Sequence, residues 1–213
     1  MRILVIICTN EMNIGDIPNM IIFNNYIKQL ENVEVDYVGI SSKNDFNNYE
    51  NVFSFKFKVI NPNGPFSKMC DFITNFKSIL NYDWYIKIRT EVKLLEPLNF
   101  NIMSDNAINA RARVYTGPKQ IQYGCSVNGE GIWKNVGDCH YDAREKIVLL
   151  DDMIYVFHNN IIINGGFNFI NYNERQTEWY QSKNWIHNKI KLNVVGINLE
   201  CTKYNTFSGN INM

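Results

Sequence analysis

Two short stretches place carboxylates where this chain is otherwise apolar, and carboxylates in such positions can do chemistry. Glu91 follows the apolar segment 84–88 and comes directly after Arg89 and Thr90. A carboxylate at the carboxyl end of a strand can hold Mn²⁺ or Mg²⁺, because hard cations prefer carboxylate and phosphate oxygens. The alternative interpretation is a surface glutamate that pairs with Arg89 or with a lysine.

Asp151 and Asp152 stand side by side within the apolar segment 147–159, which breaks at the two acids and then resumes. Repulsion between adjacent carboxylates raises the pKa of one of them, and a carboxylate with a raised pKa is suited to act as a general base. We expect Asp152 to take that role, with Asp151 as the second candidate. The alternative interpretation is that one of these acids caps the N-terminus of a helix.

Glycine-rich phosphate loops are missing from the sequence. Neither G-x-G-x-x-G nor G-x-x-x-x-G-K-[ST] occurs, and no glycine follows the first apolar segment before Gly15. This disfavours a dinucleotide-dependent dehydrogenase and a P-loop kinase, although a nucleotide can still bind through backbone contacts at a strand end. Gly165 and Gly166 predict a tight turn or a close approach of a ligand to the backbone.

Length and composition limit the class of protein. The 213 residues are 46% hydrophobic, which is enough for one domain with a sizeable core. The 21 basic residues balance the 21 acidic residues, so no basic excess indicates a nucleic-acid partner. Five widely spaced cysteines without a C-x-x-C motif favour reduced thiols. Because the N-terminal apolar run is too short for a signal peptide or a membrane span, we expect a cytoplasmic protein.

Strand and helix patterns alternate in the first half of the chain. Four apolar or alternating segments predict strands, and two amphipathic segments predict helices that begin near Asp16-Pro18 and near Pro65; the strands are 2–8, 33–40, 52–57 and 84–88. The order predicts an α/β fold with an open, mostly parallel sheet and helices on both faces. In such sheets ligands bind beyond the carboxyl ends of the strands, where Thr9, Asn10 and 89–91 lie.

The second half of the chain is less regular. Residues 109–117 alternate like a strand, 126–133 contain the hairpin signal Asn-Gly, 173–190 predict a helix, and 194–197 predict a late strand. We therefore expect a mixed, partly antiparallel region. No linker or internal repeat interrupts the chain, so we expect one domain over 1–213.

Three segments together resemble a known family of enzymes. The N-terminal RILVIICTN, the segment YDWYIKIRTEVKLLEPLNF and the later LLDDMIYVF are similar to glycosyltransferases of the GT-A fold. The resemblance is to bacterial and viral sugar transferases, including chlorella-virus enzymes that build a capsid glycan. It implies a UDP-sugar donor and a glycan acceptor, with residues 1–95 as the nucleotide-binding half and 96–213 as the acceptor-binding half.

The resemblance also implies roles for single residues. Cys8, Thr9 and Asn10 would line the nucleotide pocket together with Thr90, and the residues that would neutralise the diphosphate are Lys68, Lys87 and Arg89. GT-A enzymes keep an Asp-x-Asp metal motif where this chain has 89–91. Here arginine replaces the first acid, so Glu91 alone is left to hold Mn²⁺ or Mg²⁺. Asp152 would activate the acceptor hydroxyl.

Two other functions compete with a glycosyltransferase. A sugar-phosphate nucleotidyltransferase uses related substrates, but it normally has a glycine-rich loop after the first strand, and this chain does not. A non-catalytic carbohydrate-binding module on the same fold is the second alternative. Binding of UDP and manganese separates the enzymes from such a module, which should ignore both.

Overall fold

A computed structural model describes residues 1–76, 81–112, 141–142, 147–148, 150–169 and 177–201. Its helices are α1 (Ile17–Lys28), α2 (Pro65–Asn75), α3 (Asn159–Ile163) and α4 (Thr177–His187), with short 3₁₀ turns at Ile14–Asp16, Phe46–Tyr49 and Phe100–Ile102. Its strands are β1 (Arg2–Cys8), β2 (Glu34–Ser41), β3 (Phe55–Ile60), β4 (Trp84–Ile88), β5 (Val92–Leu94), β6 (Ala107–Ala112), β7 (Tyr141–Asp142), β8 (Ile147–Val148), β9 (Leu150–His158), β10 (Lys191–Val194) and β11 (Leu199–Cys201).

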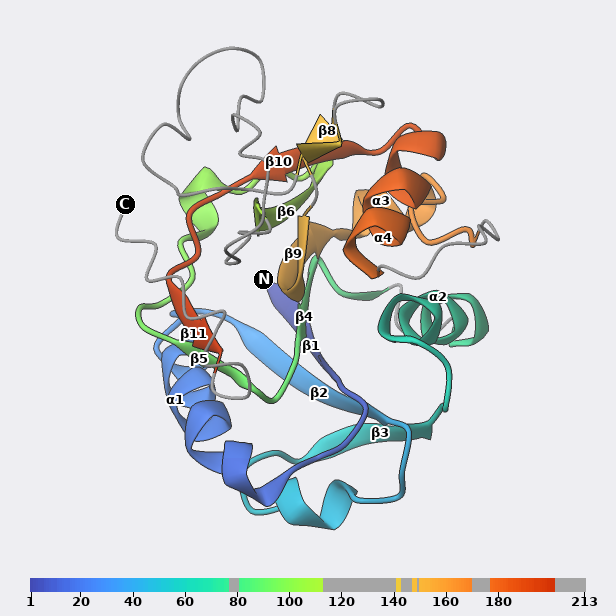
Figure 1. Ribbon diagram of the computed structural model, residues 1–213. Coiled ribbons are helices and arrows are strands. Elements are labelled where there is room, and N and C mark those ends of the chain that lie inside the picture. The colour runs from blue at the N-terminus through green and yellow to red at the C-terminus, as the bar shows by residue number, and fades with distance from the viewer. Residues whose placement is uncertain (77–80, 113–140, 143–146, 149, 170–176, 202–213) are drawn as a thin grey trace, which may run out of the picture.

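Seven strands form one sheet in the order β10-β6-β9-β4-β1-β2-β3 (Figure 1). Strand β1 pairs in parallel with β2 and β4, β2 pairs in parallel with β3, and β10 pairs in parallel with β6. Strand β9 runs antiparallel to both of its neighbours, β4 and β6. The predicted α/β class is therefore confirmed, with the antiparallel strand in the second half of the chain, as expected.

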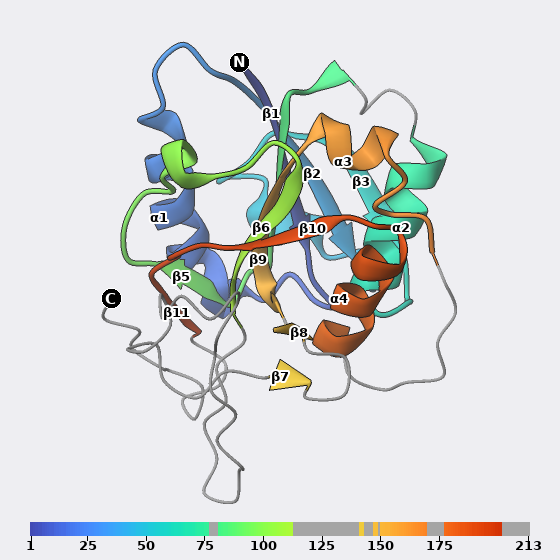
Figure 2. The same ribbon diagram turned by 90° about the horizontal axis from the view of Figure 1, so that it is seen from above.

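Helices cover both faces of this sheet, with α1 on one side and α2 and α4 on the other (Figures 1 and 2). The period of two along β1 explains this arrangement, because successive side chains of a strand point to opposite faces. Ile3, Val5 and Ile7 belong to the core cluster under α1, whereas Leu4 and Ile6 belong to the cluster under α2. Both clusters are buried, which is why the strand reads as a continuous apolar run.

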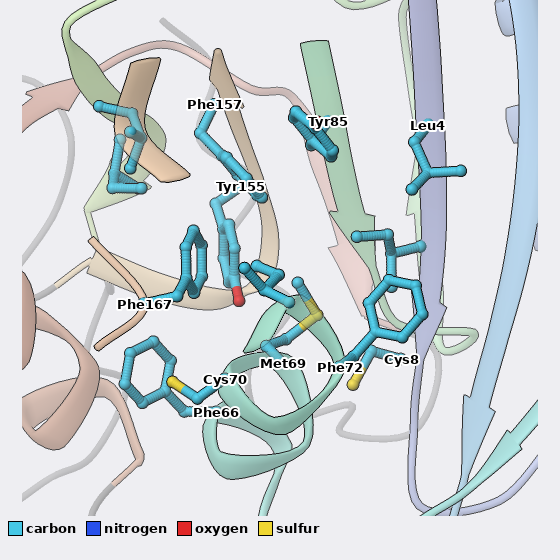
Figure 3. Close-up of a cluster of buried hydrophobic side chains, with 14 of the residues drawn as sticks. Leu4, Cys8, Phe66, Met69, Cys70, Phe72, Tyr85, Tyr155, Phe157 and Phe167 are labelled. Atoms are coloured by element: carbon cyan, nitrogen blue, oxygen red, sulfur yellow. The ribbon is translucent and has the colours of Figure 1, made fainter. Parts of the chain in front are cut away.

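Aromatic side chains dominate the core between the sheet and α2 (Figure 3). Tyr85 and Phe157 stack across the β4–β9 pair with ring centroids 5.0 Å apart. Trp185 of α4 meets Tyr155 edge to face at 5.3 Å, and the Tyr155 ring lies in turn near the ammonium of Lys87. The aromatic cluster therefore reaches from the helical layer to the polar edge of the sheet.

Two predicted strands lie about three residues from where the structure has them. The strand expected at 52–57 is β3 at Phe55–Ile60, and the late strand expected at 194–197 is β10 at Lys191–Val194. The apolar residues that shifted the predictions, among them Phe53 and Val195, are buried in the α1-side core without belonging to a strand. Burial rather than pairing explains their apolar character. The hairpin expected at 126–133 lies outside the described residues.

The acids Asp151 and Asp152 do not interrupt β9, contrary to the expected break. The strand runs from Leu150 to His158 through both acids, so neither caps a helix. Each acid lies beside an arginine, Arg111 and Arg89 respectively. A buried carboxylate is tolerated within a strand when a paired cation compensates its charge.

The described helices include none that is both long and apolar enough to cross a membrane. Cys8 and Cys70 are buried free thiols, as the reduced state predicts. The other three cysteines lie outside the residues whose side chains are described.

The turn after α3 depends on two glycines, as the sequence predicts. Gly165 has a φ of +76°, a region that side chains with a Cβ rarely adopt. A Cβ on Gly166 would lie 2.6 Å from Cγ2 and 2.9 Å from the backbone oxygen of Ile161. The segment that follows α3 therefore packs directly against this helix.

We expect Gly166→Ala to lower the free energy of unfolding by about 1–3 kcal/mol, because the added methyl group overpacks a backbone contact. Gly15→Ala is the matched control, since the nearest atom to its Cβ is at an ordinary 3.4 Å. Urea denaturation followed by circular dichroism measures both. Equal stability of the two variants would contradict the close packing at Gly166.

Candidate active site

Three chain segments that carry the predicted site residues meet at one edge of the sheet. Strands β1 and β4 are parallel neighbours, with Ile7 opposite Ile88, so the residues that follow them leave the sheet side by side. Strand β9 enters beside the end of β4, because Ile88 pairs with Ile154 in the antiparallel register. The topology thus brings 9–10, 89–91 and Asp152 together at the edge where open sheets bind ligands.

Arg89 lies between two acids at this edge. Its Nη1 donates to Oδ2 of Asp152 at 3.0 Å, and its Nη2 forms an ion pair with Oε1 of Glu91 at 2.5 Å. The side chains of the three residues are only 12%, 3% and 2% exposed. Burial alone would lower the pKa of Arg89, but Asp152 and Glu91 outweigh it and raise that pKa, so the guanidinium stays charged.

The pairing of Glu91 with Arg89 is the alternative that the sequence left open, but it forms in a buried place. A surface ion pair of this kind stabilises a protein by about 0–1 kcal/mol. In a buried pair, removal of one partner costs about 3–5 kcal/mol because the other charge remains uncompensated. Arg89 therefore holds the two acids in place.

Lys87 contributes a second buried cation next to the ion pair between Arg89 and Asp152. Lys87 is only 1% exposed, and its Nζ donates to the backbone oxygen of Asp152. The same Nζ lies 5.2 Å from the ring centroid of Tyr155. Burial lowers the pKa of Lys87, and the charge of Asp152 opposes this shift. Lys87 is therefore placed to stabilise Asp152 and to add positive potential at the strand end.

Lys68 reaches the same edge from α2 and is fully buried. Its Nζ donates to the backbone oxygen of Thr9 at 2.8 Å, to Oδ1 of Asn10 at 3.0 Å and to Oγ of Ser42 at 2.7 Å. An ammonium group has three donors, and these contacts use them all. Lys68 therefore ties α2 to the ends of β1 and β2, and it can act on a ligand through its electrostatic field.

The residues expected to line a nucleotide pocket differ in their exposure. Cys8 is fully buried and Thr9 is 4% exposed, whereas Asn10 is exposed. Burial raises the pKa of the Cys8 thiol, which leaves it a neutral core residue. Asn10 is thus the member of this group whose side chain is available for a direct contact with a ligand.

Thr90 is buried on the α1 side, and it reveals a contact that the sequence did not predict. Its hydroxyl donates to Oδ2 of Asp16 at 3.1 Å, and its backbone oxygen accepts from Nδ2 of Asn19 at 3.3 Å. Asp16 stands at the N-cap position of α1, where an aspartate is a favoured capping residue, but its side chain makes no capping hydrogen bond. It instead ties α1 to the end of β4, a role with no local sequence signal.

Asp151 lies close to Asp152 in sequence but has a different set of contacts. Its Oδ2 pairs with Nε of Arg111 at 2.5 Å, and its Oδ1 accepts from the backbone of Met153 at 3.1 Å. Because each acid faces its own guanidinium, repulsion between the two carboxylates is compensated. Asp151 is therefore held by Arg111 and the backbone of Met153, whereas Asp152 forms its ion pair with Arg89.

A divalent metal does not fit the arrangement of these side chains. In the part of the chain that the structure describes, no three His, Cys, Asp or Glu residues come together as a metal site. Glu91 is the expected ligand, yet the guanidinium of Arg89 occupies the position next to its carboxylate and next to that of Asp152. The metal expected from the sequence stays a prediction.

Comparison with known proteins identifies the fold. No known protein family and no curated protein matches the sequence. A protein assigned as a glucose-1-phosphate thymidylyltransferase from Bacillus anthracis matches the structure with a TM-score of 0.59 and 11% identity, over 100% of this chain and 94% of that one.

Two further solved structures have the same fold. The bifunctional glycosyltransferase WbbM matches with a TM-score of 0.50 and 13% identity, and 4-diphosphocytidyl-2C-methyl-D-erythritol synthase from Anaerococcus prevotii matches with a TM-score of 0.53 and 9% identity. The matches cover 90% and 92% of this chain, but only 38% of WbbM against 87% of the synthase. The chain thus has a fold shared by glycosyltransferases and nucleotidyltransferases, and the expected likeness to chlorella-virus enzymes stays a prediction.

We expect Lys68→Met to lower the free energy of unfolding by about 1–3 kcal/mol, because three acceptors lose a charged donor. Lys43→Met is the control, since Lys43 pairs with Glu11 at the surface and both side chains are about half exposed.

Burial lowers the pKa of Lys68 in the folded state, so as pH rises the folded state releases this proton before the unfolded state does. The stability difference between wild type and Lys68→Met should therefore grow as pH rises toward the ordinary lysine pKa. Denaturant titrations at several pH values measure it, and equal losses in the two variants would contradict the buried role.

Proposed function

We propose that this protein is a glycosyltransferase that moves a sugar from a UDP-sugar to a glycan acceptor. The observation that carries the proposal is the buried cluster of Lys87, Arg89 and Asp152 at the carboxyl end of β4, next to the end of β1. The fold shared with WbbM supports it at a coarser level. We propose a viral capsid glycan as the acceptor, and this part of the proposal rests on the sequence resemblance alone.

The leaving group explains the need for cations in such a reaction. The acceptor oxygen bonds to the anomeric carbon, the bond from that carbon to the diphosphate breaks, and the electron pair leaves with the diphosphate. Cations preorganised near the departing oxygen stabilise the developing negative charge. In our proposal Arg89 makes the direct contact, while Lys87 and Lys68 contribute positive potential from their buried positions.

The acceptor proton requires a base, and we assign that role to Asp152. Its carboxylate is buried and is held by Arg89 at 3.0 Å. When a diphosphate attracts the guanidinium, the carboxylate of Asp152 is left with less compensation and becomes a better proton acceptor. Asp151 suits this role less, because its two oxygens already bind Arg111 and the backbone of Met153.

A sugar-phosphate nucleotidyltransferase is the second candidate, and one observation favours it. The thymidylyltransferase-like protein of Bacillus anthracis matches the whole of this chain. Such an enzyme would join a nucleoside triphosphate to a sugar 1-phosphate and release pyrophosphate. A glycosyltransferase would instead release a nucleoside diphosphate from a nucleotide sugar.

Incubation with each substrate pair and analysis of the released phosphate species therefore separates the two functions. Absence of both products, with sugar binding retained, would favour the non-catalytic module.

We expect Asp152→Asn to slow sugar transfer by about 100-fold or more, because the amide cannot accept the acceptor proton. The affinity for UDP should not fall, since the amide oxygen can still accept a hydrogen bond from Arg89 and the guanidinium, with one charge fewer beside it, remains free to meet the diphosphate. Product formation is measured by chromatography and UDP binding by calorimetry.

Asp105→Asn is the control for this prediction, because Asp105 is exposed in the turn before β6, whereas the opposite end of that strand pairs with the start of β9 near Asp152. Both the rate and the affinity of this variant should match wild type. An unchanged transfer rate in Asp152→Asn would remove Asp152 from the mechanism.

A further inference from the structure

The guanidinium of Arg89 occupies the position at the end of β4 where the sequence alone predicts a metal ion. It contacts Asp152 at 3.0 Å and Glu91 at 2.5 Å, so both carboxylates have a cation beside them before any ligand binds. The guanidinium of Arg89 also keeps its charge at physiological pH, because arginine is not deprotonated in proteins and the two acids raise its pKa further. The site therefore contains a permanent positive charge of its own.

Charge balance at this edge disfavours an additional divalent cation. Next to Arg89, the carboxylates of Glu91 and Asp152 contribute two negative charges, and Arg89 and Lys87 contribute two positive charges, all on residues that are buried or nearly so. Lys68 adds a third cation farther along the edge, beside Thr9 and Asn10. A metal ion between the acids would have to displace Arg89 or leave two positive charges in excess in a desolvated place. Both alternatives are costly, because uncompensated charge is strongly unfavourable away from water.

Arg89 also retains hydrogen-bonding capacity for an anion. Among the described residues its buried Nε has no hydrogen-bond partner, although a guanidinium carries five donors in a fixed fork. Such a fork matches the oxygens of a phosphate group in a bidentate way. The guanidinium can therefore exchange a carboxylate partner for a phosphate without a net loss of hydrogen bonds.

We propose that this site binds the diphosphate of its nucleotide donor without a divalent metal ion, with Arg89 as the fixed cation. The inference rests on the proposed function and deepens it. It assigns Glu91 a different role from that of a metal ligand. Glu91 positions Arg89 when the site is empty and competes with the diphosphate for the guanidinium.

Glu91→Gln separates the two roles, because they predict changes of opposite sign. If Glu91 only holds Arg89, loss of its charge should free the guanidinium and tighten UDP binding in EDTA by about three- to tenfold. If Glu91 ligates a metal, the same change should weaken UDP binding and remove its response to Mn²⁺. The substitution keeps the size and an oxygen acceptor, so the fold should tolerate it.

Calorimetry with UDP as the probe tests the proposal on the whole chain, in EDTA and in Mn²⁺ or Mg²⁺. We expect the dissociation constants in the three conditions to agree within about fivefold, below the usual range for coupled sites. Arg89→Lys should weaken UDP binding by about tenfold or more, because lysine keeps the charge but loses the fork. Glu200→Gln is the matched control, since Glu200 pairs with Lys93 at 3.2 Å in a partly exposed place. Its affinity for UDP should equal that of wild type.

The outcomes of this experiment distinguish the inference from the function on which it rests. UDP binding that requires Mn²⁺, or that Glu91→Gln weakens, would overturn the metal-free site and leave the glycosyltransferase proposal standing. Absence of UDP binding in every condition would overturn both. Metal-independent binding that Glu91→Gln strengthens and Arg89→Lys weakens would support the proposal.

Discussion

Arg89 compensates two buried acids at once, and the polar edge of the sheet depends on that contact. Asp152 lies 63 residues away from Arg89 in the sequence, so the ion pair joins the end of β4 to the beginning of β9. The second acid, Glu91, lies two residues after Arg89 in the short connection to β5, so the same guanidinium also holds the chain where it leaves β4. Removal of a partner from a buried pair costs about 3–5 kcal/mol, a large part of the stability of an ordinary domain.

Two lysines extend the same principle around this edge. Lys87 and Lys68 are buried cations, and each donates to one backbone oxygen near a strand end, that of Asp152 near the start of β9 and that of Thr9 directly after β1. Burial lowers the pKa of both lysines, so their charges carry a cost in the folded state. Three buried cations within one region of the fold create a positive potential that a diphosphate would complement. Stability and anion recognition would then rest on the same side chains.

Arg89 is already paired with two carboxylates in the empty site, so it must exchange partners when a ligand arrives. For the reaction proposed here, the exchange would move Arg89 from carboxylates toward phosphate oxygens and leave Asp152 more basic. Donor binding and activation of the base would thereby be coupled through one side chain. The pair Arg111–Asp151 on the neighbouring strands has no such role in our proposal, although it is built from the same residue types.

The sequence by itself determined the α/β class, the strands β1 and β4 and the helices α1 and α2, because these follow from local periodicity and capping residues. It also indicated that Thr9, Asn10 and 89–91 share an edge, since the carboxyl ends of parallel strands meet there. Only the tertiary structure decided what Glu91 and Asp152 contact. Both contacts involve Arg89, but one of the partners lies on a distant strand, and no local pattern specifies which acid a given arginine will meet. The same reason applies to Asp16, which local sequence indicates as a helix cap and which the packing of α1 directs to Thr90.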